Sequence, residues 1–92
     1  MTKTVSKEHA FWFCNSKGWV GQIAHNLEEF SKEIKVVPTD SLDFHLRDNK
    51  NDFEAWLMNV MQEKRLAKKI SKIKKEGLRG EDLRKALTSL FE

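Results

Sequence analysis

The stretch that decides the fold reads Asn51-Asp52-Phe53-Glu54-Ala55-Trp56-Leu57-Met58-Asn59-Val60-Met61. Five of its apolar side chains recur at the spacing of one helical face, namely Phe53, Trp56, Leu57, Val60 and Met61. Asn51 and Glu54 form an Asn-x-x-Glu pattern, which is typical of a helix start because the Asn side chain accepts a hydrogen bond from the backbone N–H three residues later. The stretch therefore predicts an amphipathic helix that begins after Asn51 and buries Trp56.

The same cap pattern occurs earlier in the chain, at Asn26 and Glu29. We expect Asn26 to accept from the Glu29 N–H, and Glu29 to accept from the Asn26 N–H in return. A helical face follows, formed by Leu27, Phe30 and Ile34. Because the residue before a proline is pushed out of the α region, this helix should stop before Val36-Val37-Pro38.

A short second helix is expected between these two, over about residues 40–47. Thr39 is its expected N-cap, and its inner face consists of Leu42, His45 and Leu46. Residues 47–50 are all polar and predict a turn.

The last third of the chain predicts two more helices. The first has an apolar stripe of Leu66, Ala67, Ile70 and Ile73, and Gly77 is placed to end it in the left-handed conformation. The second begins after Gly80, where Glu81 and Asp82 suit the positive end of a helix. Its buried side consists of Leu83, Ala86, Leu87, Leu90 and Phe91.

The N-terminal part predicts a β-hairpin. Two aromatic runs, Phe11-Trp12-Phe13-Cys14 and Trp19-Val20, flank a four-residue turn, Asn15-Ser16-Lys17-Gly18. Two strands alone are marginally stable in water, so this hairpin must lie against the helices. We therefore predict an α+β fold, mainly α, with about five short helices packed with one aromatic hairpin. Residues 1–8 are expected to be a flexible N-terminal arm, and residues 9–92 a single compact domain.

Composition narrows the class of protein. The chain has 92 residues, which suits one small domain, and its single cysteine excludes an intramolecular disulfide. The N-terminal residues lack the apolar core of a signal peptide, and no apolar run is long enough to span a membrane. We expect a soluble, cytoplasmic protein with no membrane contact.

Charge is distributed unevenly along the chain. Residues 1–63 carry 7 Lys/Arg and 10 Asp/Glu, a net charge of −3, whereas residues 64–92 carry 10 and 4, a net charge of +6. A basic helix that includes Lys68, Lys69 and Lys72 admits a nucleic-acid partner, although a solvated helix face has the same composition. The turn Gly77-Leu78-Arg79-Gly80 permits a similar choice between a phosphate clamp and a plain helix cap, and Glu81 and Asp82 would repel a phosphate.

Several pieces of the chain form a pattern when taken together. They are Phe11-Trp12-Phe13-Cys14, Asn26-Leu27-Glu28-Glu29-Phe30, Val37-Pro38-x-x-Ser41-Leu42-x-Phe44-His45, Asn51-Asp52-Phe53-Glu54-x-Trp56-Leu57, Leu66-Ala67-x-x-Ile70 and Gly80-Glu81-Asp82-Leu83-Arg84. Over about residues 11–87 the chain resembles a small prokaryotic domain family of unknown function, best represented in archaea. This resemblance implies a domain and no particular activity.

The resemblance also raises a question about the middle of the chain. Members of that family usually have a Gly-Asp or similar turn between the Trp helix and the Leu-Ala helix, where this chain has Met61-Gln62-Glu63-Lys64. The sequence therefore leaves open whether these two helices are continuous or broken.

His45 is the one candidate for acid–base chemistry. A histidine held by Asp52 or Asp48 could be poised near neutral pH, but no nucleophile or oxyanion donor accompanies it in a motif. The alternative is a structural histidine whose ring bonds the polar start of the following helix. The residues predicted to have such structural roles are His45, Asn51, Asp52, Phe53 and Trp56. We favour that structural role.

Metal and cofactor sites are not indicated. His9, Cys14, His25 and His45 show no zinc-ligand spacing, and no cofactor motif is present, so we expect no metal and no cofactor. Cys14 is interpreted as a small buried hydrophobe.

The hairpin offers the best candidate for a partner surface. Alternate strand residues face opposite sides, so Phe11 and Phe13 should point one way, and Trp12 and Cys14 the other. One face is then either open to a partner or covered by helices. We predict a non-enzymatic protein-interaction or regulatory module that contacts a protein partner through Trp12 and Trp19, or through Lys68, Lys69 and Lys72. A nucleic-acid-binding module is the first alternative, and a ligand or enzymatic site near His45 the second.

Overall fold

The computed structural model describes residues 4–47 and 50–91. A two-stranded antiparallel sheet comes first, made of β1 (Phe11–Asn15) and β2 (Gly18–Ala24). The helices follow in the order α1 (Leu27–Val36), α2 (Thr39–His45), α3 (Asp52–Asn59), α4 (Lys64–Lys75) and α5 (Gly80–Ser89). The predicted class, α+β and mainly α, is confirmed. The predicted arm falls partly outside the described residues, at 1–3, and the predicted turn at 47–50 does so at 48–49.

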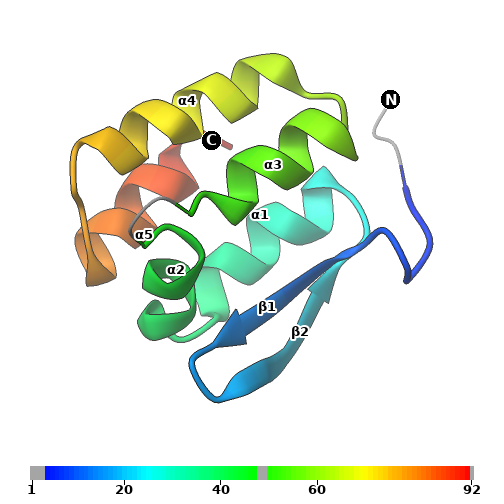
Figure 1. The fold of residues 1–92 in the computed structure, drawn as a ribbon, viewed down its shortest axis with the longest axis horizontal. Helices are drawn as coiled ribbons and strands as arrows, with labels where there is room; N and C mark the ends of the chain where they lie inside the picture. Colours follow the sequence, from blue (N-terminus) through cyan, green and yellow to red (C-terminus); the bar gives the residue numbers. More distant parts are fainter. Residues whose placement is uncertain (1–3, 48–49, 92) are drawn as a thin grey trace.

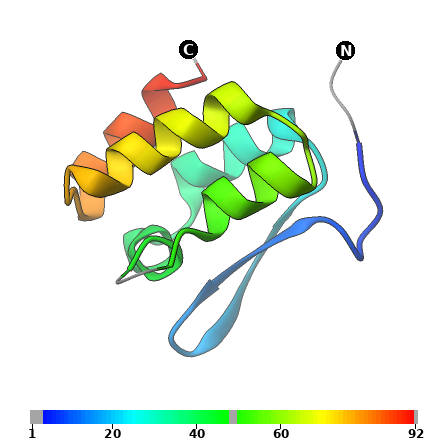
Figure 2. The same ribbon diagram turned by 45° about the horizontal axis from the view of Figure 1, so that its top comes forward.

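The helices form a bundle with the hairpin against one side (Figure 1). Helix α4 lies along α3, whereas α5 contacts α1, α2 and α4. The hairpin divides its contacts, since β1 packs against α2 and β2 against α1. Figure 2 shows that the tip of the hairpin extends away from the helices. No helix among the described residues is long and apolar enough to cross a membrane.

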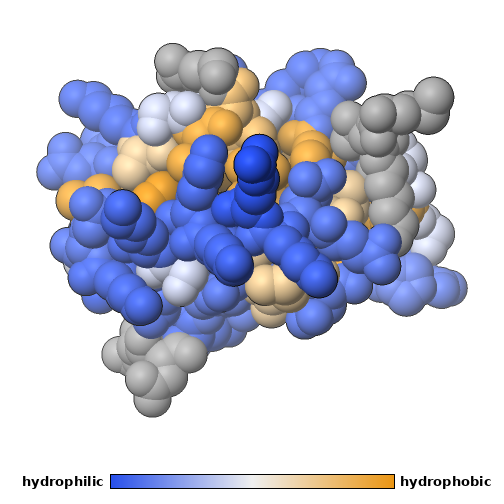
Figure 3. Space-filling view, turned by 90° about the horizontal axis from the view of Figure 1, so that it is seen from above, coloured by the Kyte–Doolittle hydropathy of each residue, from blue (hydrophilic) through white to orange (hydrophobic). Residues whose placement is uncertain are grey.

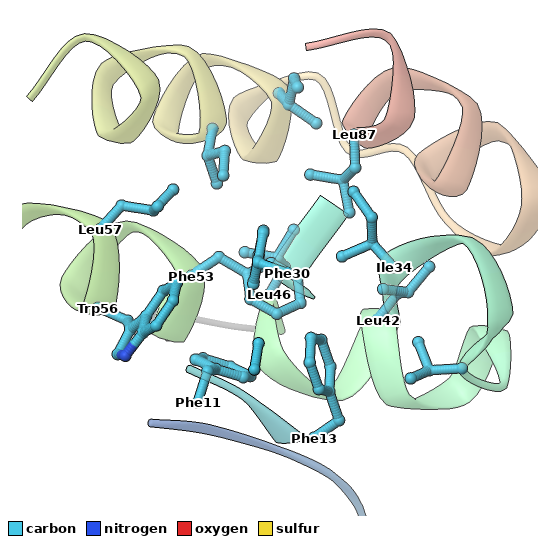
Figure 4. Close-up of a cluster of buried hydrophobic side chains, with 14 of the residues drawn as sticks. Phe11, Phe13, Phe30, Ile34, Leu42, Leu46, Phe53, Trp56, Leu57 and Leu87 are labelled. Carbon is cyan, nitrogen blue, oxygen red and sulfur yellow. The ribbon is translucent and has the colours of Figure 1, made fainter. Parts of the chain in front are cut away.

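The core is built around aromatic rings from three different elements, β1, α1 and α3 (Figure 4). Phe30 of α1 stacks on Phe13 of β1 and on Trp56 of α3, with ring centroids 5.7 and 5.4 Å away. Trp56 is only 6% exposed, as predicted, and its indole N–H donates to the His9 carbonyl oxygen at 2.8 Å. Phe53 meets Phe30 edge-on at 5.3 Å. Such offset and edge-on pairs stabilise a core beyond the area they bury.

Both predicted asparagine caps are present. Asn51 Oδ1 accepts from the Glu54 N–H at 3.0 Å, and Asn26 Oδ1 accepts from the Glu29 N–H at 2.8 Å. The expected return bond from Asn26 to Glu29 is wrong. Glu29 Oε1 accepts instead from the His25 backbone N–H at 2.8 Å and lies 2.9 Å from His25 Nδ1. The backbone and the side chain of His25 thus both bond the same carboxylate oxygen.

The limits of the first two helices differ slightly from the predicted ones. Helix α1 includes Val36 and ends there, one residue later than predicted. Thr39 does not cap α2: Pro38 is the N-cap and Thr39 is the first helical residue. The predicted inner face of α2 is correct, since Leu42, His45 and Leu46 are all buried.

Helices α3 and α4 are separate, which answers the question left open by the sequence. The chain turns between Val60 and Glu63, where Gln62 has a φ of 58°, the only positive φ outside glycine among the described residues. The Glu63 N–H donates to the Leu57 carbonyl oxygen at 2.7 Å, which closes the end of α3. Helix α4 ends at Lys75 with Glu76 as its C-cap, and Gly77 follows in the predicted left-handed conformation, with a φ of 72°.

The hairpin is tighter at its tip and longer in its second strand than predicted. Asn15 pairs with Gly18, so Ser16 and Lys17 alone form the loop, and β2 continues to Ala24. The register shifts between Trp12 and Cys14, which pair with Ile23 and Trp19. Gly21, with a φ of 97°, lies in the part of β2 that holds the extra residues. Glycine adopts such a φ without strain.

Candidate functional site

His45 is buried and both of its ring nitrogens are engaged. Its side chain comes from α2 and is 4% exposed. Nε2 accepts from the Cys14 backbone N–H at 2.9 Å, and Nδ1 lies 2.7 Å from Asp52 Oδ2. Because Nε2 is an acceptor, Nδ1 carries the proton and donates it to the carboxylate. Neither nitrogen is therefore left to take a proton from a substrate.

The electrostatics of this pair favour the neutral imidazole. Burial lowers the pKa of His45 because it disfavours the charged ring, although the bond to Asp52 opposes this. Lys50 Nζ lies 3.4 Å from the same Asp52 oxygen and shares that carboxylate. The predicted contact between His45 and Asp52 is thus present, whereas Asp48, the other proposed partner, lies outside the described residues.

Ser41 is a buried polar residue that the sequence reasoning did not single out for a role. It lies one helical turn before His45, and its Oγ donates to the Cys14 carbonyl oxygen at 2.8 Å. Both backbone groups of Cys14 are therefore bonded by side chains of α2. An exposed strand edge invites pairing with another chain. Ser41 and His45 occupy the outer edge of β1 at Cys14, so no other strand can pair there.

The face of the hairpin that points away from the core is not covered by the helices. By the register, Trp12, Cys14, Trp19 and Ile23 share this face, which we call the hairpin outer face. Cys14 is only partly buried there, so its interpretation as a buried hydrophobe is wrong. Phe11 and Phe13 share the other face, as predicted, and this face is the one that points into the core. The two indole rings touch, with centroids 5.1 Å apart, and Trp19 is 54% exposed.

The polar atoms of these indoles are already bonded within the chain. Trp12 Nε1 donates to the Lys7 carbonyl oxygen at 3.1 Å, and Trp19 Nε1 donates to the Gln22 carbonyl oxygen at 2.9 Å. Lys7 Nζ also lies 5.6 Å from the centroid of the Trp12 ring. The hairpin outer face therefore offers ring surface to a partner and no indole hydrogen-bond donors.

The N-terminal residues contact the chain just beyond the end of β2, at His25 and Asn26. The Val5 N–H donates to the His25 carbonyl oxygen at 2.9 Å, and Val5 packs on the edge of the core. Asn26 Nδ2 donates to Thr4 Oγ1 at 3.2 Å. The flexibility predicted for the arm stays a prediction. These contacts place residues 4 and 5 of the arm beside His25 and Asn26.

The basic helix forms a hydrophilic face without aromatic residues of its own. Lys68, Lys69 and Lys72 are exposed on α4. Figure 3, which views the molecule from above Figure 1, shows hydrophilic residues spread across the middle of this face, with hydrophobic ones visible between and behind them. Sequence-tolerant binding of single strands relies on aromatic side chains for base stacking, and α4 itself supplies none.

Helix α5 begins directly after the turn at residues 77–80, and a carboxylate of α2 already bonds its first backbone N–H. The Gly80 N–H donates to Asp43 Oδ1 of α2 at 3.0 Å. Glu81 and Asp82 add two acidic side chains in the first turn of α5. A phosphate at this position would have to displace Asp43 and face two further carboxylates. Within residues 4–47 and 50–91, no three His, Cys, Asp or Glu side chains converge as metal ligands would.

With this geometry in view, one comparison with known proteins is decisive. The family of unknown function DUF5752 matches residues 1–92. The chain belongs to the DUF5752 family. Neither the curated proteins nor the solved structures contain a significant match. Membership of DUF5752 agrees with the predicted resemblance to a family of unknown function, and it assigns no activity to His45, to the basic helix or to the hairpin outer face.

Proposed function

We propose that the protein is a non-enzymatic protein-interaction or regulatory module whose contact surface is the hairpin outer face. The observation that carries the proposal is the half-exposed Trp19 ring, which packs on Trp12 on the side of the sheet away from the core. A large aromatic side chain left in water costs free energy that a partner can recover by covering it. Tryptophan is also among the residues that dominate binding energy at interfaces.

The other two candidate functions have less support. The engaged nitrogens of His45 argue against acid–base chemistry at that residue. For nucleic acid, the exposed lysines of α4 supply only a generic positive face, and the Gly80 N–H already holds Asp43. The single cysteine suits a reducing compartment, so we place the protein in the cytoplasm as part of the same proposal.

Site-specific photo-crosslinking in cells tests this function. One version of the chain carries p-benzoylphenylalanine in place of Ser16 at the hairpin tip, and a matched version carries it in place of Lys69 on α4; both positions are exposed. We expect a discrete protein adduct from position 16 and none from position 69. An adduct from position 69 alone, or one that nuclease removes and protease does not, would contradict the proposal.

A further inference from the structure

The two edges of the hairpin are treated differently. On the β1 side, the Cys14 N–H donates to His45 and its carbonyl oxygen accepts from Ser41. In an antiparallel pair, a residue whose backbone groups point outward faces a partner whose groups point to the opposite edge. Cys14 pairs with Trp19, so the backbone N–H and C=O of Trp19 point to the outer edge of β2.

Just beyond the end of β2, the chain already bonds its own N-terminal residues. His25 follows β2 by one residue, and its carbonyl oxygen takes a hydrogen bond from the Val5 N–H. The irregular register around Gly21 then interrupts the edge between Ile23 and Trp19. The part of this edge that is left for an extended peptide is therefore the Trp19 end, next to the projecting tip (Figure 2).

The cations of the hairpin outer face lie apart from the nearest carboxylate at the tip, since Asp40 of α2 lies on the β1 side, where its Oδ2 accepts from Asn15 Nδ2 at 3.3 Å. Residues 11–24 contain a single charged side chain, Lys17, which lies exposed in the loop beside Trp19. Lys7 borders the other end of the hairpin outer face, over the Trp12 ring. Both indole N–H groups are bonded to backbone oxygens, so polar recognition falls to these two ammonium groups and to the Trp19 backbone.

We infer that the hairpin outer face and the adjoining β2 edge bind an extended peptide segment in which an apolar side chain is flanked by carboxylates. The inference rests on the proposed function and specifies the partner's chemistry. The apolar side chain covers the Trp19 ring, the carboxylates meet Lys7 and Lys17, and the peptide backbone pairs with Trp19. Strand addition of this kind gains affinity from main-chain hydrogen bonds and specificity from side chains.

Three blocked peptides of about six residues, the usual strand length, test each component. The first alternates Glu and Val, the second alternates Lys and Val, and the third is the Glu–Val peptide with alternate amides N-methylated. Titration into the ¹⁵N-labelled full chain is followed by the amide resonances. We expect the Glu–Val peptide to move Lys17 and Trp19, and the other two to bind at least about tenfold more weakly. Raising salt from about 0.1 M to about 1 M should weaken the Glu–Val complex.

Variants of the chain separate the contacts. We expect Trp19→Ala to weaken Glu–Val binding at least about tenfold, as for a central aromatic contact. Lys17→Glu should weaken it several-fold, whereas the matched charge reversal Lys69→Glu on α4 should leave it unchanged. Because Trp19 and Lys17 are exposed, the dispersion of the core resonances should stay that of the parent chain, which checks the fold.

The outcomes distinguish this inference from the proposed function. Equal binding of the Lys–Val or the N-methylated peptide, or Glu–Val binding that Trp19→Ala does not weaken, would overturn the inference. So would shifts of Lys17 and Trp19 with protein concentration alone, which would make a second copy the occupant. A protein adduct from position 16 without Glu–Val binding would overturn the inference and leave the proposed function standing. Crosslinks from position 69 alone, with peptide shifts confined to α4, would overturn both.

Discussion

His45→Ala should destabilise the fold, with a magnitude that follows from the contacts it removes. Loss of the imidazole leaves the Cys14 N–H without its acceptor, which costs about 1–3 kcal/mol for a buried donor. It also empties the space between the rings of Phe11 and Phe53, whose centroids lie 4.8 and 5.3 Å away. With the cavity included, we expect a loss of about 3–5 kcal/mol in the free energy of unfolding. That is a large part of the ~5–14 kcal/mol typical of a chain this long.

The same residue should give the fold a pH dependence of known sign. Burial lowers the pKa of His45 in the folded chain, whereas the unfolded imidazole titrates near its usual value of about 6.5. Between those two pKa values the unfolded chain binds a proton that the folded chain does not. The free energy of unfolding is therefore highest above pH ~6.5 and falls as the pH drops toward the folded pKa. The facing groups, Asp52 and Lys50, oppose each other in this shift.

Urea unfolding followed by circular dichroism, from about pH 8 to about pH 5, measures both effects. His45→Gln separates them, since an amide can accept from Cys14 and donate to Asp52 without titrating. It should be more stable than His45→Ala and lose part of the pH dependence. His9→Ala is the control, because His9 is exposed, and it should change stability by less than about 0.5 kcal/mol at neutral pH. A loss below about 1 kcal/mol for His45→Ala, or an unchanged pH slope for His45→Gln, would refute the reasoning.

Four further predictions address the core, a long-range contact, a turn and the basic helix. Trp56→Ala should cost about 3–5 kcal/mol, since the ring is buried among Phe30 and Phe11; a melting shift of one or two degrees would contradict its central place. Arg84→Met should cost about 2–4 kcal/mol by urea unfolding, because the guanidinium donates to carbonyl oxygens at the end of α1, and Arg84→Lys should recover only part. Equal stability of the two Arg84 variants would show that the paired geometry is unimportant. Gln62→Gly should raise the free energy of unfolding by up to about 1 kcal/mol, and with it the melting temperature, since glycine tolerates a φ of 58°. A lower melting temperature would mean that the Gln62 side chain stabilises the fold by more than its backbone conformation costs. A labelled DNA duplex should bind no more tightly than about 10⁻⁶–10⁻⁴ M and be released by salt, and salt-resistant binding that requires Lys68, Lys69 and Lys72 would contradict this.

The helices could be predicted because their signals are local. An asparagine cap and its acceptor are three residues apart, as at Asn51 and Asn26, and apolar faces repeat within two turns. The limits of α1 and α2 differ from the predicted ones because Pro38 both follows the end of α1 and begins α2 without a side-chain cap. The end of α3 escaped prediction because Gln62 adopts a left-handed conformation that its own side chain does not favour.

The candidate site could be predicted only in part. Alternation along β1 separated Phe11 and Phe13 from Trp12, but no pattern showed which face the helices would cover. The contacts that decide this are distant in sequence: Ser41 and His45 reach Cys14 across 27 and 31 residues. Arg84 reaches the Ile34 carbonyl oxygen across 50. Contacts of this kind depend on how the elements pack, and that information is absent from any short window of sequence.

The central claim is that the hairpin outer face serves binding and contributes little to the fold. The most direct test compares the yield of the position-16 protein adduct between the parent chain and Trp19→Ala. We predict that Trp19→Ala abolishes the adduct while the free energy of unfolding changes by about 1 kcal/mol or less, since the ring is half-exposed. An undiminished adduct from Trp19→Ala, or a loss of stability as large as that of Trp56→Ala, would contradict the account.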